Sequence, residues 1–273
     1  MRRLIINADD FGLSAGVTAG ILEAHAAGTV TSTSMMVGCP GWEDAVSQRR
    51  PASSLGIGLH FNLLVGRPLT PARSLTVSQT GAFLPLAALV RRALAGRLSG
   101  EEVEAECVAQ IAAMRHAGIV ATHIDSHRHT HALPVVRGAV ARVAAREQLP
   151  LRRPVESHRW FPNDLASQLH RGLVGWSWRV TSFGAPRTRA PDHFIGVSMQ
   201  GGERFAGQLA AVLDRLPPGT TEMMVHPGYV DSGLRAVDGY TWQRELELAA
   251  LISAPVRQRL SRGDIGLATF ADL

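Results

Sequence analysis

The stretch Leu4-Ile-Ile-Asn-Ala-Asp-Asp10, close to the start of the chain, decides the fold. Its apolar run, 4–6, passes directly into polar residues that end in two neighbouring aspartates, which is typical of a short buried strand followed by a polar loop. Ser14 has the side chain of a helix N-cap, apolar residues follow it at helical spacing, and Gly28 ends that helix. The opening of the chain therefore predicts a strand, a polar turn and a helix, in that order.

The same alternation continues to the end of the chain. Further strands are predicted over 33–37, 56–59, 119–124, 194–197, 222–225 and 265–269. Helices are predicted from the capping box at Ser99 to 116–118, and over 134–147, 203–215, 241–252 and 254–262. The segment 151–192 is expected to be the least regular part, because it is rich in prolines, glycines and aromatic residues. Strands that alternate with helices predict an α/β fold, a single-domain deformed (β/α) barrel of the TIM-barrel-like type over 1–273.

The composition is that of a globular protein with a sizeable core, since 45% of the 273 residues are apolar and 19% are charged. The net charge of +5 rests on arginine alone, because the chain has no lysine, and the arginines are scattered along it. We therefore expect no nucleic-acid partner. Cys39 and Cys107 match no metal or redox spacing, and no segment approaches the roughly 18 apolar residues of a membrane span. A cytoplasmic protein is expected.

Polar residues gather where the predicted strands end. Asp9 and Asp10 follow the first strand, His60 and His226 each directly follow a later one, and a histidine-rich segment follows another. In parallel α/β folds the C-terminal ends of the strands meet on one face, where active sites are built. We therefore expect these scattered motifs to form one site.

The adjacent carboxylates of Asp9 and Asp10 suit two different tasks. Neighbouring side chains on an extended backbone point apart, so one carboxylate can ligate a metal while the other accepts a proton from a bound water. The alternative is a solvated turn before Gly12.

His226 lies before a proline that holds its backbone extended, and a histidine with a pKa near neutrality can protonate a leaving group. A buried structural histidine is the alternative there.

The strongest signal is the segment 123–131, which carries five polar side chains at alternate positions: His123, Asp125, His127, His129 and His131. Wherever the backbone is extended, this spacing directs all five to one side. Imidazole mixed with carboxylate suits zinc, magnesium or manganese. Five groups are too many for one ion, so some must support the ligands or contact a substrate. A histidine-rich surface loop is the alternative.

Four motifs in this order resemble those of the YdjC-like carbohydrate deacetylases, which include chitooligosaccharide and hopanoid-associated deacetylases. The motifs are Asn-Ala-Asp-Asp-Phe-Gly-Leu-Ser (7–14), Gly-Leu-His-Phe (58–61), Thr-His-Ile-Asp-Ser-His-Arg-His-Thr-His (122–131) and Val-His-Pro-Gly-Tyr-Val-Asp (225–231). The resemblance extends from the first strand to the closing residues of the chain. One departure is visible, because Arg128 stands where the family has a histidine; an extended backbone would turn its side chain away from the histidine face.

The resemblance implies a deformed barrel and a set of site residues. One divalent metal ion, Mg²⁺ or Zn²⁺, would be held by Asp10, His60 and His127. Asp9 would be the catalytic base and His226 a catalytic histidine. Support of the ligands or contact with the substrate is then expected of His123, Asp125, His129, His131, Phe61 and Tyr229.

The implied activity is hydrolysis of the amide bond of an N-acetylated sugar, a chitooligosaccharide or a glycolipid amino sugar, with release of acetate. Candidates for stacking on a sugar ring are Trp160, Trp176, Trp178, Tyr229 and Trp242. Rival hypotheses are a metal-dependent phosphoesterase or other amidohydrolase on a similar barrel, and a non-catalytic sugar- or metal-binding protein. The rival phosphoesterases and amidohydrolases often carry His-x-His after the first strand, where this chain has two aspartates. Monomer and homodimer both remain open.

Overall fold

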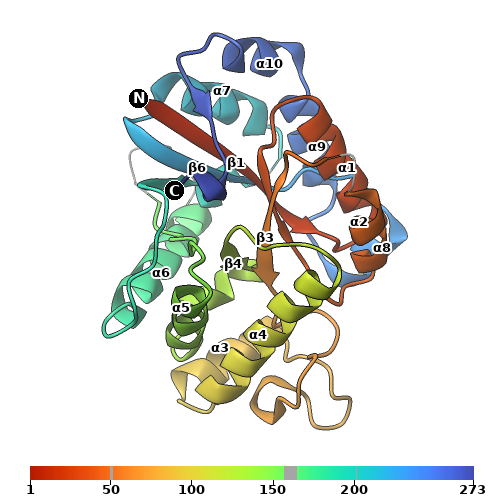
Figure 1. The fold of residues 1–273 in the computed structure, drawn as a ribbon, viewed down its shortest axis with the longest axis vertical. Helices are drawn as coiled ribbons and strands as arrows, with labels where there is room; N and C mark the ends of the chain where they lie inside the picture. Colours follow the sequence, from red (N-terminus) through yellow and green to blue (C-terminus); the bar gives the residue numbers. More distant parts are fainter. Residues whose placement is uncertain (50–51, 157–164, 201) are drawn as a thin grey trace.

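The computed structural model describes residues 1–49, 52–156, 165–200 and 202–273. In these residues a parallel sheet has the strand order β4-β3-β2-β1-β6-β5, with β7 paired to β1 (Figure 1). The strands are β1 (Arg2–Phe11), β2 (Ser32–Met35), β3 (Gly56–Phe61), β4 (Ile124–Ser126), β5 (His193–Ile195), β6 (Gly219–Val225) and β7 (Gly266–Leu267). All of the pairings between these strands are parallel, as the alternation of strands and helices predicted.

Helices cover the outer side of this sheet. The α-helices are α1 (Ala15–Ala26), α2 (Trp42–Gln48), α3 (Leu86–Leu94), α4 (Gly100–His116), α5 (Val136–Arg146), α6 (Leu165–Thr181), α7 (Phe205–Arg215), α8 (Ser232–Val237), α9 (Trp242–Leu251) and α10 (Ala254–Leu260). The 3₁₀-helices are η1 (Arg73–Leu75), η2 (His127–Ala132), η3 (Val197–Met199) and η4 (Phe270–Asp272). Ser14 caps α1 as expected, because its side chain accepts a hydrogen bond from the Val17 amide.

Strand β1 lies at the centre of the sheet and separates two environments. Alternate side chains of a strand point to opposite faces. Leu4 and Ile6 face the large core between the sheet and the helices, whereas Ile5 packs with Phe270 inside the curl of the sheet. Asn7 and Asp9 continue the inner row toward the C-terminal end of the strand. The barrel interior is therefore apolar at one end and polar at the other.

The sheet curls into a barrel, but in the part of the chain that the structure describes no regular strand closes it between β4 and β5. Between its outer strands β4 and β5, the segment 151–156 fills the gap with single parallel bridges, Ile124 to Leu151 on one side and Glu156 to Phe194 on the other. The predicted deformed (β/α) barrel is confirmed, with a weak seam between its edge strands.

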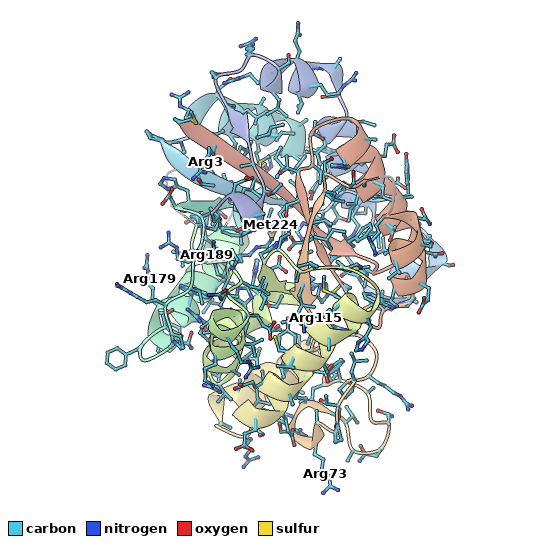
Figure 2. The ribbon with its side chains drawn as sticks, in the orientation of Figure 1. Arg3, Arg73, Arg115, Arg179, Arg189 and Met224 are labelled. Carbon is cyan, nitrogen blue, oxygen red and sulfur yellow. The ribbon has the colours of Figure 1, made fainter. Side chains whose placement is uncertain are left out.

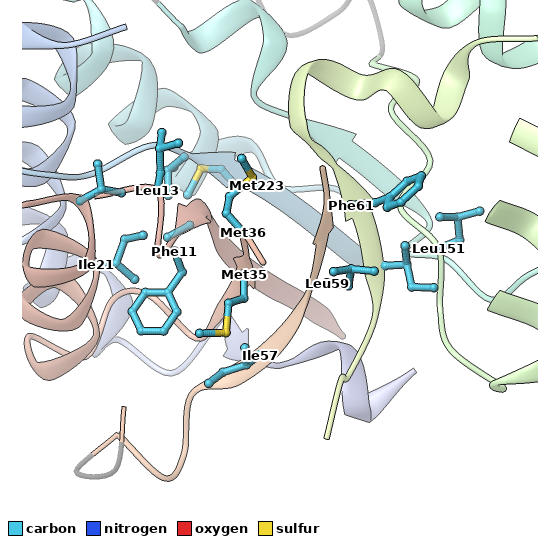
Figure 3. Close-up of a cluster of buried hydrophobic side chains, with 14 of the residues drawn as sticks. Phe11, Leu13, Ile21, Met35, Met36, Ile57, Leu59, Phe61, Leu151 and Met223 are labelled. Atoms are coloured by element: carbon cyan, nitrogen blue, oxygen red, sulfur yellow. The ribbon is translucent and has the colours of Figure 1, made fainter. Parts of the chain in front are cut away.

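The core is built from the strands and the helices that cover them. Apolar side chains of β1, β2, β3 and α1 interlock in one cluster (Figure 3), which includes Phe11, Ile21, Met35 and Leu59. Phe61 belongs to the same cluster and is completely buried.

Among the described residues, no helix is long and apolar enough to cross a membrane.

Several regions differ from the sequence prediction. The strand predicted over 119–124 begins only at Ile124, so the prediction was wrong for the five residues before it. The segment 151–192 was predicted to be irregular, but it contains the long helix α6. The shorter helices α2, α3 and α8 were also missed, because runs this short carry little periodic signal.

Close backbone packing of α1 against the loop after β6 generates a stability prediction. A Cβ atom at Gly20 would lie 2.6 Å from the Cα of Gly228, whereas a Cβ at Gly207, also within a helix, would meet nothing within 4 Å. Gly20→Ala should therefore lower the free energy of unfolding by about 1–3 kcal/mol. Gly207→Ala, the matched control, should raise it by roughly 0.5–1 kcal/mol through helix propensity. Urea unfolding measures both, and shifts of the same sign would contradict the packing argument.

Candidate active site

The two neighbouring aspartates reach one pocket because the strand is irregular between them. The pairing of β1 with β2 shifts register between Ala8 and Phe11, and Asp10 has a φ of 72°. A regular strand would send the two side chains to opposite faces, but a bulge with left-handed backbone re-aims one of them. Asp9 and Asp10 therefore both line the pocket at the C-terminal ends of the strands.

Two histidine rings converge on the carboxylate of Asp10. The Nδ1 atom of His127 lies 2.9 Å from Oδ1 of Asp10, and Nε2 of His60 lies 3.2 Å from the same oxygen. All three side chains are buried. Burial alone would raise the pKa of Asp10, but Arg244 and His127 outweigh it and hold this pKa well below its usual value. The carboxylate is therefore charged at any ordinary pH.

His60 lies between two carboxylates. Its Nδ1 atom is 2.7 Å from Oδ1 of Asp125, while its Nε2 atom faces Asp10. Burial lowers the pKa of His60, but Asp125, Asp9 and Asp10 raise it more strongly, to about 10. In the absence of another cation the ring thus takes a second proton to satisfy both neighbours.

These residues fit a divalent metal ion. One atom each from Asp10, His60 and His127 can be chosen so that all three lie within 4.8 Å of one another. One carboxylate oxygen and two imidazole nitrogens form a donor set that zinc and similar ions accept. Asp125 is placed to accept a hydrogen bond from Nδ1 of His60, which leaves Nε2 free as a ligand atom and fixes the ring.

Arg152 fills the polar part of the barrel interior and binds three carboxylates. Its guanidinium contacts Asp9 through two nitrogens at 2.6 and 2.7 Å, Asp125 at 2.8 Å and Glu222 at 2.6 Å. The arginine side chain and those of Asp125 and Glu222 are completely buried. Burial raises the pKa of Glu222 to about 7, although Arg152 opposes the shift. Arg152 thus orients Asp9 and Asp125 and compensates their charge.

A second arginine holds Asp10 from the other side of the pocket. Nη2 of Arg244 lies 2.6 Å from Oδ2 of Asp10 and 2.9 Å from Oδ2 of Asp238. Arg128 also forms an ion pair with Asp238. The expectation that an extended backbone turns Arg128 away from the histidine face is therefore wrong: its φ is 55°, it lines the pocket with His127 and His129, and it pairs with Asp238, the residue after α8.

His226 lies in the same pocket, held at its backbone by a buried acid. The amide of His226 donates to Oε2 of Glu247 at 2.6 Å, and the hydroxyl of Tyr240 donates to the other oxygen of this carboxylate. Burial lowers the pKa of His226 to about 4, although Asp9 and Asp10 act in the opposite direction. The ring is therefore neutral at pH 7, and its Nδ1 atom has no hydrogen-bond partner among the described residues.

The histidine-rich segment does not stay extended. Strand β4 ends at Ser126, and Arg128 and His129, inside η2, have left-handed φ values of 55° and 53°. His127 and His129 line the pocket, and Asp125 lies behind His60. The single face that period-two spacing predicted is therefore divided.

Several predicted site residues lie outside the pocket. The ring of His123 stacks on Phe270 with centroids 3.7 Å apart, in the apolar end of the barrel. His131 is buried against Ser126 and Trp178, and Phe61 lies in the core. Tyr229 is exposed and donates its hydroxyl hydrogen to Glu23 of α1. Of the candidates for sugar stacking, Trp176 and Trp242 are exposed, Trp178 is buried, and Trp160 lies outside the described residues.

Sequence reasoning missed the residues that support the site: Arg152, Glu222, Asp238, Tyr240, Arg244 and Glu247. In a chain whose 28 cationic residues are all arginine, a single arginine carries little signal. Tyr240, Arg244 and Glu247 share the turn before α9 and α9 itself, and their spacing of three and four residues was the one available cue.

Comparison with known proteins identifies the family of this chain. The model of the family described as YdjC-like protein matches residues 3–262, which is nearly the whole chain. The chain belongs to the YdjC-like family.

Two relatives of similar length are named carbohydrate deacetylases. A carbohydrate deacetylase of Geobacillus stearothermophilus is 36% identical over 274 residues, covering 99% of this chain and 98% of that protein. A carbohydrate deacetylase of Vibrio vulnificus strain CMCP6 is 34% identical over 271 residues, covering 99% and 96%. A crystal structure from Enterococcus faecalis, described as a candidate cellobiose-phosphate cleavage protein, has a TM-score of 0.78 and 29% identity, covering 99% and 98%.

The three ion pairs of Arg152 generate a second stability prediction. Arg152→Met would leave three buried carboxylates without their cation, and breaking a buried pair in this way costs about 3–5 kcal/mol. Arg115→Met removes an ion pair to Glu147 from an arginine that is mostly exposed, and should change stability by less than about 1 kcal/mol. Thermal unfolding of both variants measures the difference. Equal effects would show that Arg152 does not compensate the buried charges.

Proposed function

We propose that this protein is a metal-dependent hydrolase that removes acetyl groups from N-acetylated sugars. The observation that carries the proposal is the cluster of Asp10, His60 and His127 at the base of a pocket that also holds Asp9 and His226. The names of the relatives, carbohydrate deacetylases over nearly the full length of the chain, support this substrate class. Chitooligosaccharides and glycolipid amino sugars are the candidate substrates.

The three ligand residues are assigned to one divalent ion, Mg²⁺ or Zn²⁺. What such an ion supplies is Lewis acidity toward a carbonyl oxygen and toward water. Arg244 holds the oxygen of Asp10 that the two histidines leave free, and Asp125 holds the far nitrogen of His60. The side chains of Asp10 and His60 are therefore oriented before an ion arrives.

Asp9 is proposed as the base. It lines the pocket beside Asp10 but belongs to a different set of contacts, because Arg152 grips both of its oxygens and Asn7 donates to one of them at 2.9 Å. This grip fixes the carboxylate toward the pocket, where it can take a proton as water attacks the acetyl carbon. Positioning of this kind is what general-base catalysis requires.

His226 is proposed to protonate the departing amine. Its ring is neutral in the free protein, since burial lowers its pKa to about 4. As the carbon–oxygen bond forms, negative charge develops in the pocket and favours the protonated imidazole. The proton that Asp9 took from water can then move to the ring of His226, which lines the same pocket, and from there to the sugar nitrogen. The carbon–nitrogen bond breaks to give acetate and a free amine.

Acetate release tests the reaction class. Purified protein supplied with Mg²⁺ or Zn²⁺ should release acetate from N-acetylglucosamine oligomers, and should release no phosphate from sugar phosphates. Phosphate release without acetate would replace the proposal by a phosphoesterase on the same barrel. Tight sugar binding without either product would indicate a binding protein.

The ligand assignment generates a prediction on metal content. His60→Ala and His127→Ala should each remove one of three ligand atoms and lose nearly all bound metal. His129→Ala, a matched control from the same pocket, should keep it, and Asp9→Asn should keep the metal while losing most turnover. Metal analysis of purified variants, with circular dichroism for the fold, measures this. Full occupancy in His60→Ala and His127→Ala would remove the assignment.

The role of His226 generates a prediction on substrate dependence. A sugar amine leaves poorly without a proton, and general acid catalysis contributes about 10²–10⁴-fold. His226→Ala should therefore lose about 10²-fold or more in kcat/KM on an N-acetyl sugar, and much less on nitrophenyl acetate, whose leaving group needs no proton. Steady-state measurement of kcat/KM on both substrates, for the variant and the unmodified protein, tests this role. Equal losses on amide and ester would make His226 a packing residue.

A further inference from the structure

Among the side chains that the structure describes, helix α6 packs on the rest of the protein through one face. Arg171, Gly175 and Trp178 are buried on that face. The Trp178 ring lies 5.6 Å from the ring of His131, and Ser177 donates to the carbonyl of Ala132. The helix therefore packs against η2, the segment that carries His127 and His129, and lies at the edge of the molecule beside α5 (Figure 1).

The opposite face of α6 is apolar and exposed. It carries five large side chains at intervals of four and three residues, continuing into the turn after the helix: Leu169 at 58% exposure, Leu173 at 66%, Trp176 at 62%, Val180 at 54% and Phe183 at 97%. At 3.6 residues per turn this spacing places the first four in one row on the helix, and Phe183 follows them in the turn. We call these five residues the α6 stripe.

An amphipathic surface helix normally turns its apolar face toward the core. Here the core receives Arg171, Gly175 and Trp178, while the leucines, a tryptophan and a phenylalanine face outward. Single exposed apolar residues are ordinary, but a continuous row of this length is typical of an interaction surface.

The charge around the α6 stripe identifies the kind of partner. From residue 165 to residue 191 the sequence contains no aspartate or glutamate, while Arg179 and Arg187 are exposed there. Figure 2 shows Arg179 projecting from this edge of the molecule, whereas Arg189 donates to the carbonyls of Gln148 and Leu273. A second copy packed stripe to stripe would bring these cations together with no acid of the segment to offset them. An anionic surface would complement them.

We propose that the α6 stripe docks the protein on the surface of an anionic lipid bilayer. Leucine, tryptophan and phenylalanine on one face of a helix, with arginines at its margins, is the pattern of helices that lie in the membrane interface rather than cross it. Phe183 and Trp176 would enter the interface, and Arg179 and Arg187 would meet lipid phosphates. This inference does not depend on the proposed deacetylase activity.

Vesicle co-sedimentation of the full chain tests the proposal. The protein should bind phosphatidylcholine vesicles that contain about 30% phosphatidylglycerol, bind pure phosphatidylcholine much less, and be released by high salt. The triple variant Leu173→Gln, Trp176→Gln, Phe183→Gln should lose at least about tenfold in vesicle affinity while keeping its circular dichroism spectrum, because all three side chains are exposed. Arg179→Gln should weaken binding by roughly fivefold.

Matched controls separate the α6 stripe from the rest of the surface. Val120→Gln replaces a strongly exposed apolar residue elsewhere, and Arg115→Gln an exposed arginine on α4; neither should change vesicle binding. Absence of binding to anionic vesicles, or binding that the triple variant retains, would overturn the proposal. So would a dimer, seen by analytical ultracentrifugation of the unmodified protein, that the triple variant abolishes, because a second copy would then cover the stripe.

Discussion

The grip of Arg152 on three buried carboxylates is the constraint on which the site depends. Ionised side chains inside a protein are costly unless they are paired and hydrogen-bonded. Asp9, Asp125 and Glu222 come from three different strands, and a single guanidinium at the axis of the barrel joins them. Because Asp125 in turn orients His60, the position of a candidate metal ligand is set through this arginine.

Arg244, which lines the pocket, holds Asp10 as Arg152 holds Asp9. It binds the Asp10 oxygen that faces away from the histidines, and Asp238 links it to Arg128 at the mouth. The two arginines divide the adjacent aspartates between them, one for Asp9 and one for Asp10. The division of labour that we propose for the two neighbouring carboxylates therefore has a physical basis in their separate cationic partners.

The barrel and the residues at its strand ends could be predicted from the sequence because both follow from periodicity. Apolar runs followed by polar residues located β1, β3 and β6 together with Asp10, His60 and His226. The arginines could not be predicted, since their role arises only when distant strands meet.

The histidine segment was predicted wrongly because left-handed backbone at Arg128 and His129 breaks the alternation. Helix α6 was missed because its glycines and aromatic residues favour helix weakly, and packing on η2 stabilises it instead.

The seam of the barrel, residues 151–156 between β4 and β5, contains Arg152, whose side chain holds the carboxylates of the pocket. Where other neighbouring strands share ladders, β4 and β5 are joined through 151–156 by single bridges, and segments with few backbone hydrogen bonds open at the lowest free energy. The amide of Arg152 lies in this seam, donating to the carbonyl of Ile124, while its guanidinium holds the carboxylates of the site. Because backbone and side chain belong to one residue, we expect opening of the seam to strain the contacts of that guanidinium with its partners. Amide hydrogen exchange at the seam therefore reports on the charge state of the pocket, and whatever binds the ordered site also holds the barrel shut.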